Sequence, residues 1–418
     1  MISSGRLRFL ATLLLIAPTI PSGGSTLDDP KLREGYEAIL AEYDSAMKRY
    51  MAEAAKAKDE ADYEARAKPL YPDSRAYANR FVDLAAANPG DPASRDALLW
   101  VLGTMRTDRR ENPALARAID LLIGSHADDL QAARATLSLS DRQSPQLDRL
   151  CAAMDAGARS REVKGTACLA LGRHLLMKSE VVAFLAGEAS PFRLPFEEAD
   201  PSGKPTTKLG KPVFEAAYEA HLRSLDPVAL ANEAERSFER VMAEYANVPN
   251  APKARRPTLG EEARASLDEL RNLAVGRPAP EIEGPGLDGA PLKLSDYRGK
   301  VVLLVFWGSW CGPCLDQAPH ERELAARHKD RPFAILGVDC EEDKEKGIEA
   351  ASREGMTWPH FFDAGIGEGP ICARYHVQGF PTVFVIDAKG VIRSKHLVGS
   401  LLDKVVEGLL QEAEAANQ

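Results

Sequence analysis

The sequence predicts a multidomain protein in which an all-α helical array is followed by an α/β domain. In residues 27–272, Ala, Leu, Arg and Glu dominate, and apolar residues recur at helical spacing. From residue 275 the pattern changes to frequent turn signals, with aliphatic strand-like runs between helical segments. A chain of 418 residues is also too long for one ordinary core. We therefore expect one domain at 27–272 and a second at 275–418.

The composition narrows the classes of function. Hydrophobic residues make up 44% of the chain and charged residues 28%, which is typical of a soluble globular protein. The formal net charge of −9 argues against nucleic acid or an anionic membrane surface as the main partner.

Residues 1–24 have the order of a secretory signal peptide. Arg6 and Arg8 precede an apolar run, Phe9 to Ile20, and small residues follow it, so cleavage is expected after Gly24. The run is shorter than the ~20 residues of a membrane span, so membrane contact is expected only if this segment is retained. We expect an exported, periplasmic or otherwise extracytoplasmic protein, in which all six cysteines could be paired.

The helical array consists of amphipathic segments separated by Pro- and Gly-containing breaks. "DALLWVLGTM" (96–105) and "ANEAERSFERVMAEY" (231–245) each place apolar residues on one face. "NPGDP", "ENP" and "LDP" each precede a new helical pattern. "FERVMAEYANVP" resembles tetratricopeptide-like repeats, although the ~34-residue period of those repeats is not present. A Pro-, Gly- and Lys-rich stretch, 187–212, is expected to be a surface excursion.

The C-terminal part alternates strands and helices. Strand patterns fall at "VVLLVFW" (301–307), "FAILGVDC" (333–340), "WPHFFD" (358–363), "TVFVIDAKG" (382–390) and "VIRSKHLVG" (391–399). Helices are expected at about 312–328, near 343–354 and from Leu401 onward. Because two strands are almost entirely aliphatic, we expect a sheet that is covered by helices on both faces.

Two cysteines stand where the first buried strand gives way to a helix, in the motif Cys311-Gly312-Pro313-Cys314. At the first turn of a helix, free N–H groups and the helix dipole favour a thiolate at Cys311. Cys314 lies one turn further on the same face, within reach of a disulfide. Pro313 suits the first turn, and Trp310 can shield the thiol from water. The spacing indicates a redox-active pair, in which Cys314 resolves a mixed disulfide formed at Cys311.

Zinc binding and a purely structural disulfide account for this motif less well. A zinc site needs a second closely spaced pair, whereas Cys340 and Cys372 are isolated. A structural disulfide across so small a ring would constrain the unfolded chain only slightly. The eight histidines show no metal-ligand spacing, and His320 and His328 are expected to be surface or packing residues. We therefore expect no metal and no cofactor.

"FWGSWCGPC" followed by "GFPTVFVID" resembles the thioredoxin superfamily, in particular its exported TlpA/ResA-like branch. The lead-in "GRPAPEI" with "LDGAPLKLSDYRGKVVLL", and the extra segment between "GVD" and "GFPT", add to the resemblance, which covers 275–418. It implies a thioredoxin-like domain with Cys311 as nucleophile and Cys314 as resolving thiol. It also implies that Pro381 is a cis-proline packed against the disulfide and that Phe380 offers backbone groups to an extended substrate.

The chain departs from this family at two positions. Thioredoxins carry a buried Asp where this chain has Val305, and ResA-like members carry a Glu where it has Gln317. Either carboxylate would help to move the proton of Cys314. Without them we expect slower reduction at neutral pH, with a rate that rises at alkaline pH.

The other four cysteines fall into two pairs. Cys151 and Cys168 lie at similar distances from a turn between two helical patterns, so they could form a structural disulfide or remain buried thiols. Cys340 ends a strand and Cys372 begins the segment that leads to "GFPT", and a bridge between them is a further possibility that could be structural or could relay electrons.

The leading interpretation is an exported thiol–disulfide oxidoreductase. Its partners would be client proteins with cysteines or disulfides and an upstream redox protein. A peroxiredoxin-like thiol peroxidase is an alternative, but Leu304 and Gly308 occupy the positions of the Pro and Thr/Ser of the peroxidase pattern. A third possibility is a helical-repeat binding or scaffold protein with an auxiliary redox domain.

Overall fold

The computed structural model describes residues 28–105, 113–186 and 214–416, except for Lys253, Arg255, Ile366, Gln378, His396 and Val398. The predicted signal segment and the predicted surface excursion lie outside the described residues. Across the described ranges, no helix is both long and apolar enough to cross a bilayer. The chain forms two compact units, residues 1–174 with 247–259 and residues 175–246 with 260–418. The predicted domain boundary near residue 275 stays a prediction.

The first unit is built from helices. They are α1 (Pro30–Ala54), α2 (Glu60–Arg66), the 3-10 helix η1 (Lys68–Leu70), α3 (Ser74–Ala87), α4 (Pro92–Met105), α5 (Pro113–Ser125), α6 (Leu130–Ser138) and α7 (Pro145–Gly157). The long helix α8 (Arg161–Leu185) begins in this unit and ends in the second.

Several helices begin where the sequence predicts. The three Pro- and Gly-containing breaks end at the first residues of α4, α5 and α10 (Pro227–Glu244). Proline suits a first helical position because its missing N–H has no intrahelical partner there. Asp29, Asp73 and Asp226 stand one residue before α1, α3 and α10, where their side chains accept backbone N–H groups of the first turn.

The predicted apolar faces form cores. On α4, Leu98, Leu99, Val101 and Leu102 are all buried. Trp100 of the same helix packs on Phe81 of α3 with ring centroids 4.5 Å apart. Aromatic stacking of this kind adds to the free energy gained by burying apolar surface.

Before the α/β part, the described residues of the second unit form the end of α8, then α9 (Ala216–Arg223), α10 and α11 (Leu259–Asn272). The α/β part runs as β1 (Glu283–Pro285), β2 (Pro291–Lys293), the 3-10 helix η2 (Leu294–Tyr297), β3 (Val301–Trp307), α12 (Gly312–Arg327), β4 (Phe333–Asp339), α13 (Lys344–Arg353), β5 (His360–Phe362), α14 (Pro370–Arg374), β6 (Thr382–Ile386), β7 (Ile392–Lys395) and α15 (Gly399–Ala416).

The main sheet is mixed, with strand order β5-β4-β3-β6-β7. β3 pairs in parallel with β4, which pairs in parallel with β5, whereas β3–β6 and β6–β7 are antiparallel. All seven residues of β3 are buried, as expected for a central strand covered on both faces. The predicted all-α region followed by a thioredoxin-like α/β domain is thereby confirmed.

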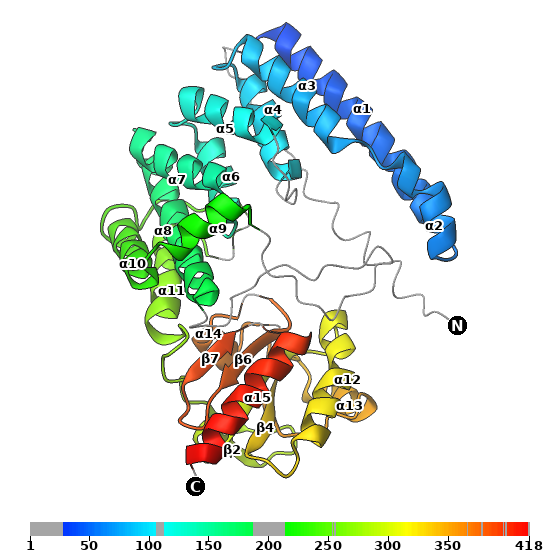
Figure 1. The fold of residues 1–418 in the computed structure, drawn as a ribbon, viewed down its shortest axis with the longest axis vertical. Coiled ribbons are helices and arrows are strands. Elements are labelled where there is room, and N and C mark those ends of the chain that lie inside the picture. The colour runs from blue at the N-terminus through cyan, green and yellow to red at the C-terminus, as the bar shows by residue number, and fades with distance from the viewer. Residues whose placement is uncertain are drawn as a thin grey trace. The chain divides into compact units, whose positions relative to one another are not determined.

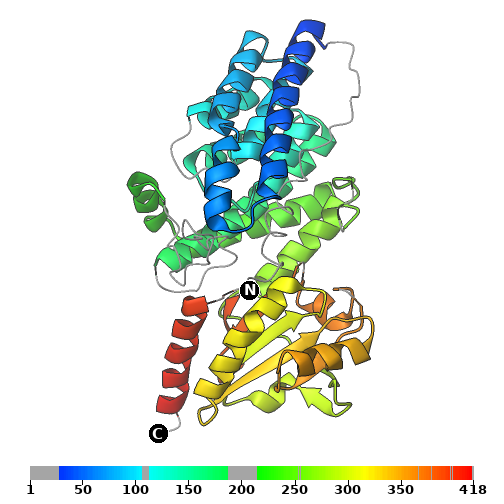
Figure 2. The same ribbon diagram turned by 90° about the vertical axis from the view of Figure 1, so that its right-hand side faces the viewer.

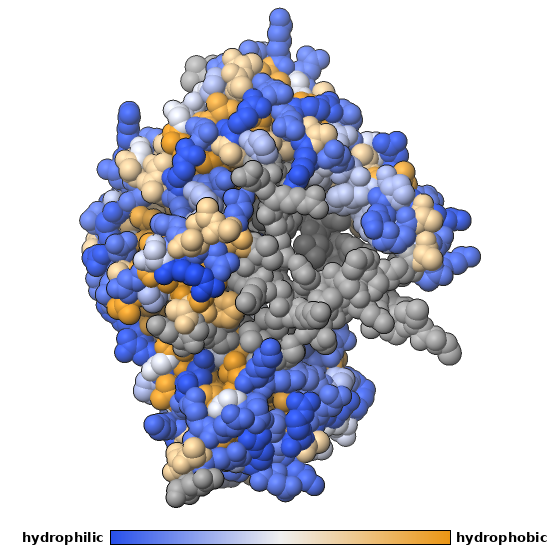
Figure 3. Space-filling model, viewed as in Figure 1, coloured by the Kyte–Doolittle hydropathy of each residue, from blue (hydrophilic) through white to orange (hydrophobic). Residues whose placement is uncertain are grey.

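Alternate residues of β3 point to two different hydrophobic cores. Val305 and Trp307 pack in one core with residues of α12, α13 and α15, whereas Phe306 packs in the other with residues of α14. Figures 1 and 2 show α12 and α15 along the same side of the sheet. The side of α15 that faces the viewer in Figure 3 is largely hydrophilic, so its apolar face is the one turned to the sheet. The parallel strands β3 and β4 end at the same edge, where α12 begins.

Candidate active site at the start of α12

The loop from Trp307 to Cys311 joins β3 to α12 and positions the first cysteine. Cys311 is the N-cap of α12, and its Sγ accepts a hydrogen bond from the backbone N–H of Cys314 at 3.2 Å. Pro313 lies within the first turn of the helix. A sulfur in this position faces the free N–H groups of the helix terminus, which stabilise a thiolate once the disulfide is reduced.

The structure holds the pair as a disulfide. The two sulfurs are bonded at 2.07 Å and the Cα atoms are 5.3 Å apart. Cys311 is 5% exposed and Cys314 3%, while Gly312 and Pro313 between them are exposed. Both cysteines are therefore almost completely shielded from solvent, whereas the Gly312–Pro313 segment between them forms part of the surface.

A second segment, residues 379–382, also contributes to the site. Its Phe380 and Trp310 of the first loop form what we call the aromatic rim. The Phe380–Pro381 peptide bond is cis. Phe380 packs against the hydrophobic core that contains both cysteines of the motif. It meets Trp310 edge to face with ring centroids 4.9 Å apart, and Trp310 is 43% exposed. The structure thus brings the predicted site residues together around one exposed, partly apolar patch.

No carboxylate stands at the two family positions noted in the sequence. Val305 is buried in the same core as Cys314, and Gln317 lies half-buried on α12. Sequence reasoning missed one carboxylate on the same helix face as Cys314, two turns further along. Glu321 is buried there, and burial raises its pKa to about 7.

Two more carboxylates missed from the sequence lie at the end of β4. Asp339 is fully buried, and among the described residues neither of its carboxylate oxygens has a hydrogen-bond partner. Burial and then the nearby Glu341 carboxylate raise the pKa of Asp339 to about 7. Glu341 accepts a hydrogen bond from the backbone N–H of Ser309 at 2.5 Å, so it fixes the loop that leads into Cys311. The sequence could have placed both at this edge of the sheet, because parallel neighbouring strands end there, but it held no local signal for their burial.

An unpredicted buried pair supports the end of β3. The indole N–H of Trp307 donates to His360 Nδ1 at 3.0 Å. Burial lowers the pKa of His360 to about 4, so the imidazole is neutral at physiological pH. Since Nδ1 accepts this bond, the ring proton is on Nε2, which faces the carbonyl of Met356 at 3.4 Å. This histidine is therefore a packing residue.

The remaining cysteines are buried. Cys151 lies on α7 and Cys168 on α8, and whether they pair stays a prediction. The Sγ atoms of Cys340 and Cys372 lie 3.1 Å apart as two thiols.

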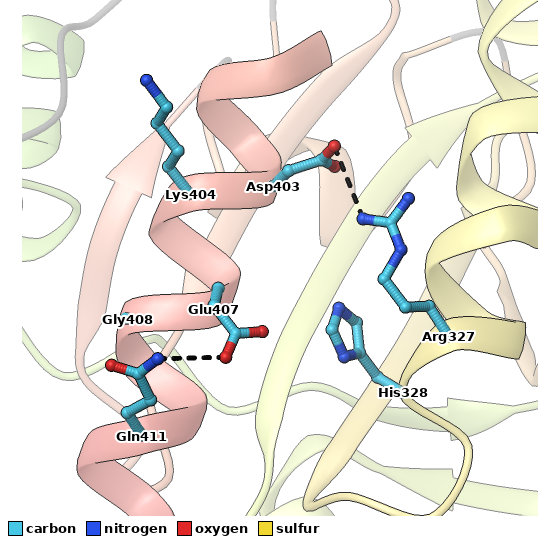
Figure 4. A pocket seen from close by; sticks show the side chains of 7 residues that line it. All are labelled: Arg327, His328, Asp403, Lys404, Glu407, Gly408 and Gln411. Carbon is cyan, nitrogen blue, oxygen red and sulfur yellow. Dashed lines mark hydrogen bonds and ion pairs between the residues drawn. The ribbon is translucent and has the colours of Figure 1, made fainter.

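A pocket of about 470 Å³ lies between the C-terminal part of α12 and α15, away from the cysteines (Figure 4). Its lining mixes opposite charges, and Asp403 pairs with Arg327 at 3.5 Å. His320 also pairs with Asp403, and His328 packs on Phe333. This pocket is therefore part of the contact between the two helices.

The α/β part is similar to known proteins. The model of the AhpC/TSA family matches residues 275–395. The thiol-disulfide oxidoreductase ResA of Geobacillus kaustophilus (strain HTA426) is 35% identical over 143 residues, which cover 34% of this chain and 80% of that protein. The thioredoxin-like protein YneN of Bacillus subtilis (strain 168) is 35% identical over 138 residues, 32% of this chain and 78% of that protein. The solved thioredoxin domain of a thiol-disulfide oxidoreductase from Bacteroides vulgatus is 30% identical, with a TM-score of 0.31, over 33% of this chain and 99% of that one.

Proposed function

Since the chain belongs to the TlpA/ResA-like thiol–disulfide oxidoreductases of the thioredoxin superfamily, we propose that it exchanges disulfides with client proteins through Cys311 and Cys314. The observation that carries this proposal is the position of Cys311 as the N-cap of α12, bonded to Cys314 beneath an exposed aromatic rim. The curated relatives named as thiol-disulfide oxidoreductases favour this chemistry over the peroxidase alternative.

The reaction consists of two successive thiol–disulfide exchanges. In the reducing direction, the Cys311 thiolate attacks a client disulfide, so that a mixed disulfide forms and one client sulfur leaves as a thiolate. Cys314 then attacks the Cys311 sulfur, which closes the bond between residues 311 and 314 and releases the second client thiol. Two electrons pass to the client. An upstream dithiol protein returns the enzyme to its reduced state, and the same steps in reverse oxidise a client.

Each residue of the site has a role in this proposal. The N-terminus of α12 stabilises the Cys311 thiolate, and Gly312 and Pro313 expose that edge of the helix. Trp310 and the segment Phe380–Pro381 form the surface on which a client chain lies. We propose an extracytoplasmic location, which the basic, apolar and small-residue order of residues 1–24 supports.

Trapping of clients tests the proposal. The full chain with Cys314→Ala should retain clients as mixed disulfides on Cys311, visible as higher-mass bands that disappear with dithiothreitol. Cys311→Ser should trap none. Absence of adducts in the first variant, together with peroxide consumption by the wild-type protein in the absence of any protein disulfide, would favour the peroxidase instead.

A further inference from the structure

A second pair of cysteines lies within the α/β part and has no role in the proposed exchange. Cys340 follows β4 directly and Cys372 lies on α14; both are 0% exposed, and their Sγ atoms are 3.1 Å apart. We propose that these residues form a structural disulfide that braces the end of β4 to α14 and is not exchanged during turnover. This inference does not depend on the proposed client exchange.

The backbone around both cysteines is already fixed. The N–H of Cys340 donates to the carbonyl of Trp307 at 2.9 Å. The N–H of Cys372 donates to Asp363 Oδ2 at 2.7 Å, and its carbonyl accepts from Val377 N–H at 2.9 Å. A bonded pair needs its sulfurs at about 2.05 Å, so closure requires a movement of about 1 Å, which side-chain rotation can supply. Because these backbone contacts already fix both residues, closing the disulfide costs little further conformational entropy.

A metal ion is the other occupant to consider, because Cys340, Asp363 and Cys372 each have one ligand atom within 4.8 Å of the others. Structural zinc sites take four ligands, and this group offers three. Both carboxylate oxygens of Asp363 already accept backbone N–H groups, from Ile371 at 3.0 Å and Cys372 at 2.7 Å. These contacts favour the disulfide.

Burial also decides when the bond forms. A disulfide oxidant, such as oxidised glutathione, must reach one thiolate, form a mixed disulfide and lose one thiol; attack by the second cysteine then releases the other thiol. The two cysteine protons end on the two thiols released. Because both sulfurs are inaccessible in the folded chain, this exchange takes place during folding, and afterwards neither reductants nor clients reach the bond.

The proposed disulfide between Cys340 and Cys372 connects the two segments that carry the active site. The N–H of Cys340 donates to the carbonyl of Trp307. The carboxylate of the next residue, Glu341, accepts the N–H of Ser309 at 2.5 Å. Cys372 lies on the helix that precedes the Phe380–Pro381 segment. The bond therefore fixes the start of the Cys311 loop relative to the segment that forms the aromatic rim.

Differential alkylation of the full chain, refolded with oxidised glutathione, tests the inference. The protein is treated with dithiothreitol in native buffer, alkylated, then unfolded, reduced and alkylated with a second reagent before peptide mapping. We expect Cys311 and Cys314 to carry the first label and Cys340 and Cys372 the second, with a 340–372 crosslinked peptide in the unreduced digest. If Cys340 and Cys372 carry the second label but no crosslinked peptide forms, or if one zinc ion is retained per chain, the inference is wrong.

A variant separates a covalent brace from simple packing of two thiols. We expect oxidised wild-type protein to melt roughly 5–10 °C above Cys340→Ala/Cys372→Ala. When both proteins are refolded and kept with reductant, this difference should shrink to a few degrees. An equal difference under both conditions would show that only packing is lost, and would overturn the inference. If the variant is poorly folded, the peptide map of the wild-type protein still decides between the two.

Discussion

Trp310 and Phe380, which lie 70 positions apart in the sequence, meet edge to face with ring centroids 4.9 Å apart. Trp310 directly precedes Cys311, and Phe380 directly precedes Pro381. The contact therefore joins the two segments to which the proposed function assigns client binding, and the exposed part of Trp310 adds apolar surface beside the disulfide.

Removal of this contact should weaken client binding more than it weakens the chemistry. Aromatic pairs contribute about 0.5–1.5 kcal/mol beyond the area that they bury. We expect Phe380→Ala and Trp310→Ala each to raise KM for a protein disulfide several-fold, with non-additive effects in the double variant. Reduction of a small disulfide, such as dithiobis(nitrobenzoate), should change less. Equal losses for both substrates would mean that the pair supports only the cysteines.

Glu341 should stabilise the loop before Cys311. Its carboxylate accepts the N–H of the half-buried Ser309, and a hydrogen bond to a carboxylate contributes about 1.5–3 kcal/mol. We expect Glu341→Ala to lower the free energy of unfolding by that amount and Glu341→Gln, which keeps an acceptor oxygen, by about half as much. Guanidinium titration measures both. The neighbouring exposed Glu342→Ala is the matched control and should change stability by less than about 0.5 kcal/mol.

The absence of a carboxylate at position 317 should affect how the rate of reduction depends on pH. Gln317 is one turn beyond Cys314, so a Glu there would face it at the i+3 spacing and could take its proton. We expect wild-type single-turnover reduction to be slow at pH 7 and to rise with pH, and Gln317→Glu to accelerate it roughly 10-fold or more at pH 7 with a flatter profile. Gln317→Met is the control. A wild-type rate that is already independent of pH would count against this prediction.

The cysteine motif and the helix starts were predictable because their causes are local. Pro92, Pro113 and Pro227 begin helices through their own geometry, and Cys311 caps α12 because a buried strand runs directly into a helix. Local sequence also contained the two segments of the aromatic rim, although only the family resemblance indicated that they meet.

Buried carboxylates were not predictable in the same way. Glu321 and Asp339 look like ordinary polar residues in the sequence, and their burial depends on how α12 and α13 cover the sheet. Gly347 of α13 approaches the carboxylate of Asp339 so closely that a Cβ at that position would lie 2.0 Å from Oδ2. The pairing of Trp307 with His360 likewise depends on the register of β3, β4 and β5, which no local pattern specifies.

These carboxylates should make the protein less stable as the pH rises from about 4 to 7. Glu321 and Asp339 each have a pKa raised to about 7 in the folded chain, against 4.5 and 3.8 ordinarily. Between those values the folded state binds more protons than the unfolded state, so the free energy of unfolding falls with pH and the loss is complete above pH 7. Guanidinium titrations at pH 5 and pH 8 should show the difference.

Asp339→Asn isolates one of the two contributions. The amide cannot ionise, so at pH 8 this variant should be about 1–3 kcal/mol more stable than the wild-type protein, and the advantage should shrink at pH 5. Glu349→Gln, an exposed position on α13, is the control and should leave the pH dependence of stability unchanged. A variant less stable than wild type at pH 8 would indicate an ionised Asp339 with a partner.

Lys395 of β7 is only 2% exposed, and its Nζ lies 3.0 Å from Glu269 of α11 and 3.9 Å from Glu180 of α8. Burial alone would lower the pKa of Lys395, but the carboxylates of Glu269 and then Glu180 more than offset this and raise it. Lys395→Met should cost about 3–5 kcal/mol because it leaves buried carboxylate without its cation. Adding Glu269→Leu should recover most of that loss, since Glu180, whose pKa burial raises to about 7, can then stay protonated. Denaturant titration of the two single variants and the double variant measures this coupling, and strictly additive losses would show that the ion pair does not join β7 to the helices.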